Sequence, residues 1–168
     1  MAAKNTAGTE LLNRKAYFRK HGIDPKLFDK SGLVWNDLKE IYADYCHWKT
    51  KLGPVQNFIV ETLSNARQIP IHAVGARIKD PEMVVGKLIR KSAEAGKPIA
   101  SLKNYTSVLQ DLVGARALHL FKEDWPAIHD YMRQYWDVVG KGSANVCQED
   151  PPYLVKQYSV CGCKKKKK

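Results

Sequence analysis

The sequence predicts a mixed α/β domain, of the α+β kind, behind a helical N-terminal element. Three observations predict it: amphipathic helical stripes before Pro70, short apolar segments that alternate with helices after it, and a globular composition. The chain has 168 residues, of which 44% are hydrophobic and 27% charged. This composition excludes a wholly disordered, collagen-like or coiled-coil chain.

The net charge of the chain, and its lack of a secretory signal or a long apolar run, limit the kinds of partner that we expect it to bind. The net charge is +11, from 28 Lys and Arg against 17 Asp and Glu, and the terminal lysine run 164–168 supplies five of these charges. A basic chain favours anionic partners such as nucleotides or nucleic acid. No run of about 18 apolar residues and no secretory signal occur, so we expect a cytoplasmic protein with no membrane partner. Homo-oligomers are possible, and the four cysteines have no zinc-site spacing.

The N-terminal third is expected to be helical. Residues 1–31 form a basic leader, partly disordered or a short helix, interrupted by Gly22 and Pro25. From residue 33, apolar side chains recur at three- and four-residue steps to residue 48, which predicts one amphipathic helix. The Gly53-Pro54 pair breaks it, and a second helix follows over residues 55–63.

Strands and helices alternate after Pro70. Residues 71–79 read as a strand, and Asp80, Pro81 and Glu82 then provide a cap, a first-position proline and a first-turn acid for a helix to about residue 96. Residues 97–110 are expected to be loop with a short helical turn. The remaining expected elements are a strand at 113–121, a helix at 125–138 capped by Asp124, a short strand at 144–147, and an unfinished strand with a poly-lysine tail at 151–168.

Basic side chains gather around the junction between the first strand and the helix after it. Arg77 and Lys79 lie two residues apart on one face of the strand, and Lys87 and Lys91 lie four apart on one face of the helix. Such a junction suits phosphate, although a solvated basic face is the plainer interpretation. Asp111, just before the second strand, adds the carboxylate that a magnesium ion bridging to phosphates needs.

The order Arg77-x-Lys79, then Lys87, then Asp111-Leu-x-Gly-x-Arg116 resembles the synthetase domain of the RelA/SpoT family over roughly residues 55–140. The resemblance implies a nucleotidyltransferase-like mixed sheet with flanking helices. It also implies GTP/GDP pyrophosphokinase activity, in which pyrophosphate passes from ATP to the 3′-hydroxyl of GDP or GTP to make the alarmones ppGpp and pppGpp of the stringent response. Residues 32–150 would then be the N-terminal half of the synthetase domain.

The resemblance also implies roles for individual residues. Arg77 and Arg116 would stack around the adenine of ATP, and Lys79 and Lys87 would hold its phosphates. Asp111 would bind Mg²⁺ and be the catalytic carboxylate.

Two departures from the family pattern shape what we expect of this chain. Met83 stands where the family has a serine, which removes one hydroxyl near the phosphates. The family's Tyr-x-Ser-x-His and Glu-x-Gln-Ile-Arg-Thr segments, which supply the guanine-stacking tyrosine and the second acid, do not occur. We therefore expect the ATP-binding half of a synthetase, inactive by itself.

Two other functions remain open from the sequence. One is a non-catalytic nucleotide- or RNA-binding fragment, and the other is a toxin-like relative that pyrophosphorylates the 3′ end of tRNA. A P-loop nucleotide site is excluded, because no GxxxxGK[ST] segment occurs.

Overall fold

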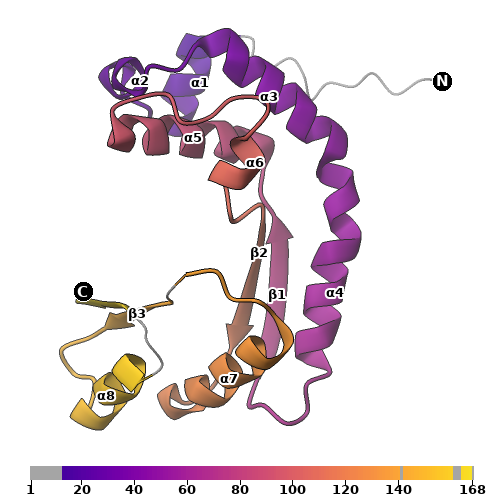
Figure 1. Ribbon diagram of the computed structural model, residues 1–168, viewed down its shortest axis with the longest axis vertical. Coiled ribbons are helices and arrows are strands. Elements are labelled where there is room, and N and C mark those ends of the chain that lie inside the picture. The colour runs from indigo at the N-terminus through magenta and orange to yellow at the C-terminus, as the bar shows by residue number, and fades with distance from the viewer. Residues whose placement is uncertain (1–12, 141, 161–163, 168) are drawn as a thin grey trace. The chain divides into compact units, whose positions relative to one another are not determined.

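The computed structural model describes residues 13–140, 142–160 and 164–167 (Figure 1). It is a mixture of helices and small sheets, which confirms the α+β class. The chain divides into two compact units, one of residues 1–58 with 76–115 and the other of residues 59–75 with 116–168. These units differ from the predicted segments 1–31, 32–150 and 151–168, because each draws its core from stretches far apart in the sequence.

The first unit is mainly helical. The predicted stripe on α3 is confirmed, with Leu38, Ile41, Tyr42 and Tyr45 buried. A 3₁₀ turn at Lys49–Leu52 separates α3 from α4, where the Gly53-Pro54 break was expected. The helices of this unit are α1 (Arg14–His21), α2 (Pro25–Ser31), α3 (Trp35–Trp48), the first half of α4 (Gly53–Ser64), α5 (Pro81–Ala95) and α6 (Tyr105–Val108).

The leader is part of this core. The Asn13 side chain caps α1 by accepting from the Ala16 amide, and the Asp24 side chain caps α2 by accepting from the Lys26 amide. Between the two helices Gly22 adopts φ +60°, a left-handed conformation that glycine takes without strain. Over its described residues the leader is helical, which is one of the two predicted alternatives, and its apolar residues Tyr17, Phe18, Ile23 and Phe28 are buried with residues of α3 and α5.

Glu82 fastens α1 to the start of α5. Its carboxylate accepts from Lys20 Nζ at 3.1 Å and lies 2.6 Å from His21 Nε2. The Tyr17 hydroxyl donates to the Glu82 backbone carbonyl at 2.6 Å, and burial raises the pKa of Tyr17, so this donor stays protonated. From its sequence position, Glu82 was expected only to favour the N-terminus of α5. The structure shows that it also connects α1 to that N-terminus.

Replacing Glu82 with glutamine should lower the free energy of unfolding by about 1–3 kcal/mol, because partly buried donors lose a charged acceptor. Urea unfolding followed by circular dichroism measures the change. Glu94→Gln, at an exposed position on the same helix, is the matched control and should change stability by less than about 0.5 kcal/mol. Equal effects of the two substitutions would show that Glu82 does not anchor α1.

The first sheet is a two-stranded antiparallel ladder of β1 (Ala73–Ile78) and β2 (Val113–Leu118). Backbone hydrogen bonds of 2.8 Å flank the ladder, from His72 to Leu118 and from Lys79 to Leu112. β2 ends three residues before its predicted limit. Beyond it, His119 Nδ1 lies 2.6 Å from the Phe121 carbonyl oxygen, so the chain turns there instead of extending.

The second unit has its own small core, and several of its segments differ from prediction: the helix expected at 125–138 ends at residue 135, and the side chain of Asp124 makes no cap hydrogen bond to it. Leu63, Ala66, Ile69, Ile128 and Tyr131 form the core. Its further elements are α7 (Trp125–Tyr135), β3 (Ser143–Val146), α8 (Pro152–Val160) and β4 (Lys164–Lys167).

The predicted unfinished strand after residue 150 is wrong, because residues 152–160 form the helix α8. Asp150 closes the preceding turn by accepting from the Cys147 amide at 2.9 Å and by pairing with Lys122, and Leu154 is then fully buried. The lysine run, expected as a tail, pairs in parallel with β3, with Ser143 opposite Lys164. Within the described residues no helix is both long and apolar enough to cross a membrane.

Candidate functional site

Three of the predicted site residues come together in the first unit. Lys79 Nζ donates to Asp111 Oδ2 at 2.8 Å, and Lys87 Nζ donates to the same oxygen at 2.5 Å. Lys79 directly follows β1, Lys87 lies within α5, and Asp111 precedes β2 by two residues. Two ammonium groups therefore converge on one carboxylate oxygen.

Backbone contacts fix Lys79 at this point. Its amide donates to the Leu112 carbonyl at 2.8 Å, which sets it beside the residue that follows Asp111. Its carbonyl accepts from the Tyr45 hydroxyl at 2.8 Å. Burial raises the pKa of Tyr45 to about 12, so the hydroxyl stays protonated as this donor.

The helix α5 places Lys87 and is itself well defined by its caps. The Asp80 side chain accepts from the Glu82 amide at 2.9 Å, and Pro81 occupies the first turn, as predicted. Lys91, one turn after Lys87, donates to the Val108 carbonyl at 3.1 Å. Lys91 therefore ties α5 to the end of α6, near Asp111, and is not a further member of the charge cluster.

The cluster is open to solvent on one side. The Lys79 side chain is 16% exposed, that of Lys87 31% and that of Asp111 43%. Asp111 Oδ1 is nevertheless buried and has no hydrogen-bond partner in the described part of the chain. Oδ2 of Asp111 thus accepts from both lysines, while Oδ1 accepts no hydrogen bond from the described residues.

The two lysines control the ionisation of Asp111. Burial raises its pKa, but the hydrogen bonds and charges of Lys79 and Lys87 outweigh burial, and the net pKa lies below its ordinary value. The stability that these ion pairs give is fully present above the ordinary carboxyl pKa of about 3.9, and it is lost as the pH falls through the lowered value.

Removing either ammonium group should raise the pKa of Asp111 toward its ordinary value. Carboxyl-carbon NMR titration of the wild type, Lys79→Met and Lys87→Met measures this directly. The wild type should titrate at the lowest pH of the three. A pKa of Asp111 that is unchanged in both variants would contradict the shared ion pair.

The two predicted arginines are placed differently. Arg77 lies on the exposed face of β1 and makes no ion pair within the described residues. Arg116 is also exposed, on the part of β2 that belongs to the second unit. Their stacking on an adenine stays a prediction.

The carboxylate present fits a metal ion only as part of a larger shell. No group of three or more His, Cys, Asp or Glu side chains in the described ranges is placed to hold a metal. Magnesium, however, is often bound through one carboxylate together with substrate phosphates and water. Asp111, with its unpartnered Oδ1, fits that single-ligand role, so the ion would arrive with the nucleotide.

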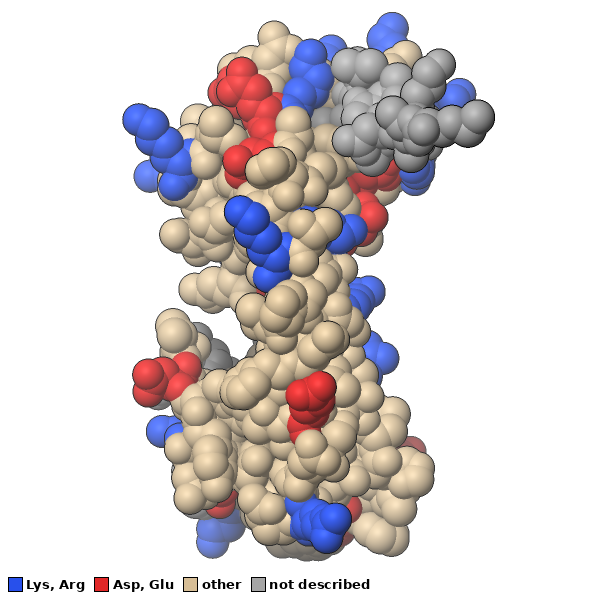
Figure 2. Space-filling view, turned by 90° about the vertical axis from the view of Figure 1, so that its right-hand side faces the viewer, with Lys and Arg blue, Asp and Glu red and all other residues tan. Residues whose placement is uncertain are grey.

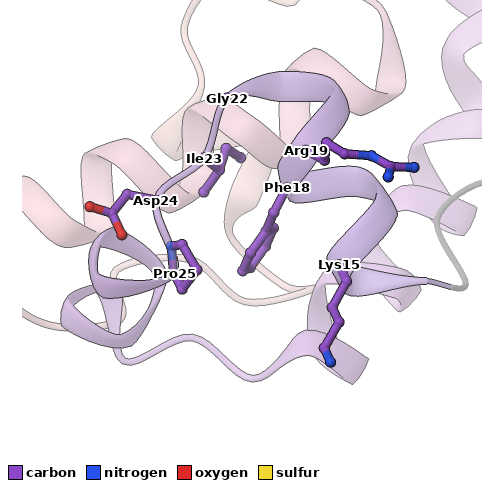
Figure 3. A pocket seen from close by; sticks show the side chains of 7 residues that line it. All are labelled: Lys15, Phe18, Arg19, Gly22, Ile23, Asp24 and Pro25. Carbon is purple, nitrogen blue, oxygen red and sulfur yellow. The ribbon is translucent and has the colours of Figure 1, made fainter.

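A shallow hollow between α1 and α2 lies elsewhere in the first unit (Figure 3). It measures about 590 Å³, with Phe18, Ile23 and Pro25 as its apolar lining and Lys15 and Arg19 as its cations. It shares no residue with the cluster of Lys79, Lys87 and Asp111. The sequence did not single out this hollow, because its two helices fell in the segment expected to be a basic leader, partly disordered or a short helix.

On the face drawn in Figure 2, Lys and Arg side chains do not form a single patch. They lie in separate groups among uncharged and acidic residues.

Comparison of the chain with protein-family models, curated proteins and solved structures found no match. The interpretation of the site therefore depends on its geometry and on the motif resemblance.

Proposed function

We propose that Lys79, Lys87 and Asp111 bind the polyphosphate of ATP together with Mg²⁺, as the donor site for pyrophosphate transfer to the 3′-hydroxyl of GDP or GTP. The observation that carries the proposal is the convergence of two lysine ammonium groups on a single carboxylate oxygen. Paired cations beside one carboxylate are the set of charges that a metal-complexed polyphosphate requires.

In this proposal each side chain acts through its charge. The ammonium groups of Lys79 and Lys87 exchange the Asp111 carboxylate for phosphate oxygens and offset their negative charge. Mg²⁺ bound with the nucleotide would offset the negative charge of the transferred group. Asp111, released from the lysines, would hold that cation, and catalysis would then depend on positioning and electrostatics without a covalent intermediate.

The wider assignment follows from the same resemblance. β1 and β2 would belong to a nucleotidyltransferase-like mixed sheet, with α5 flanking it. Cys46 and Cys147 are free thiols, in keeping with a reducing cytoplasm, where ATP and guanine nucleotides are also found.

Calorimetric titration with MgATP and with AMP tests the proposal. Because the lysines hold phosphates and not the base, MgATP should bind at least about tenfold more tightly than AMP. Equal affinities would show that the polyphosphate is not what the site recognises. Binding of a single-stranded RNA in place of MgATP would favour the RNA-binding alternative.

Pyrophosphate transfer itself should not be detectable with these 168 residues. Asp111 is the single carboxylate at a family motif position, and no guanine-stacking tyrosine of the Tyr-x-Ser-x-His type occurs. Loss of orientation of the acceptor hydroxyl alone costs on the order of 7 kcal/mol or more of the barrier. Thin-layer chromatography of radiolabelled ATP incubated with GDP measures the product, and robust ppGpp would show that a second acid and an acceptor site are present after all.

A further inference from the structure

The arrangement of Asp111 between the two lysines has a consequence for which anions the site accepts, and it builds on the proposed function. We propose that Asp111 is an internal counter-ion that makes the lysine pair selective for metal-complexed polyphosphate over the metal-free anion. Without a metal, the carboxylate competes with phosphate for both ammonium groups. With a metal, the same carboxylate becomes a ligand.

The competition follows from the contacts. Both lysines direct their Nζ atoms to Asp111 Oδ2, at 2.8 and 2.5 Å. A phosphate oxygen can take these donors only if the carboxylate gives them up. The displaced Asp111 would then stand beside a polyanion of the same charge sign, and such repulsion opposes binding in a partly buried site.

The unpartnered oxygen of Asp111 accounts for the preference for the metal-complexed anion. Asp111 Oδ1 is buried and accepts no hydrogen bond from the described residues. A buried acceptor without a donor is costly, and a divalent cation carried by the phosphates would satisfy it. Asp111 would then be a ligand of the cation instead of a competitor of phosphate, and both lysines would be free to contact phosphate.

The neighbouring cations do not relieve this competition between the Asp111 carboxylate and phosphate. Lys91 is engaged by the Val108 carbonyl, and Arg77, on the exposed face of β1, forms no ion pair with Asp111. Metal-free polyphosphate consequently meets two lysines whose positive charge is already offset in part by the Asp111 carboxylate.

Inorganic tripolyphosphate is the probe for the test, because it has no base or sugar. Its affinity is measured by calorimetry at constant ionic strength, with Mg²⁺ or with EDTA, for the wild type, Asp111→Asn and the control Asp29→Asn. Asp29 is exposed on α2, so its substitution makes the same charge change away from the cluster. Asp111→Ser serves as a second variant, and thermal unfolding checks that each variant is folded.

In the wild type, Mg²⁺ should tighten tripolyphosphate binding at least tenfold. Asp111→Asn and Asp111→Ser should bind the metal-free anion at least tenfold more tightly than the wild type and lose most of the response to Mg²⁺, while Asp29→Asn behaves as the wild type. If the wild type binds tripolyphosphate through its lysines but the Asp111 variants gain nothing in EDTA, the counter-ion role is wrong and the donor site stands. If Lys87→Met binds as well as the wild type, the donor site itself is wrong.

Discussion

Replacing Lys87 with methionine should weaken MgATP binding by about 10- to 150-fold, and Lys79→Met should have an effect of the same size. A charge-assisted hydrogen bond to phosphate contributes about 1.5–3 kcal/mol, which corresponds to that range of affinity. Methionine keeps most of the length of the side chain, so packing around β1 and α5 is disturbed little. Calorimetric titration of the wild type and the two variants measures the losses.

Lys103→Met is the matched control, because Lys103 is exposed in the loop before α6 and its replacement removes the same charge. It should bind MgATP within about twofold of the wild type. The double variant Lys79→Met with Lys87→Met should lose less than the sum of the two single losses, since both lysines share one partner. Similar losses in Lys103→Met and Lys87→Met would mean that net charge, and not the cluster, determines binding.

Replacing Phe28 with alanine should lower the free energy of unfolding by about 3–5 kcal/mol, the range for deletion of a buried aromatic ring. The ring of Phe28 lies 5.3 Å from that of Phe18 and 6.1 Å from that of Trp35, and the residue is 6% exposed. Its removal opens a cavity where α2 meets the rest of the core.

The control for this cavity is Phe58→Ala, the same substitution at a position in the same unit that is 58% exposed. It should cost less than about 1 kcal/mol. Urea unfolding followed by tryptophan fluorescence compares the two variants. A small loss for Phe28→Ala would show that the leader does not share the core of the unit.

The sequence predicted the limits of α5, which depend on local hydrogen bonding. Asp80 caps α5, Pro81 occupies its first turn and Gly96 ends it with φ +66°, as the cap rules require. The stripe on α3 was also predicted in full, because four buried residues at helical spacing leave one choice of face.

Tertiary contacts determined the parts that the sequence did not predict. The leader was read as basic, yet its few apolar residues are buried by helices that come later in the chain. Residues 151–168 were predicted to be an unfinished strand with a lysine tail, but residues 152–160 form α8. Asp150 and Lys122, 28 residues apart in the sequence, close the turn from which α8 begins, and no local pattern shows that pairing.

In the candidate site, too, the sequence predicted some of the residues, and tertiary contacts determined the role of others. The motif resemblance named Lys79, Lys87 and Asp111, and the structure brings those three side chains together. Tyr45 was missed as a supporting residue, because its helical spacing indicates burial but says nothing of its hydroxyl. Its partner, the Lys79 carbonyl, lies 34 residues further along the chain.

NMR mapping of MgATP binding tests the central claim most directly. Backbone amide and lysine side-chain signals are recorded as MgATP is added to the wild-type chain. The account predicts that the largest shifts occur at Lys79, Lys87 and Asp111, and that the signals of Lys15 and Arg19, in the hollow between α1 and α2, stay in place. Saturable binding that shifts other residues and leaves these three unchanged would contradict it.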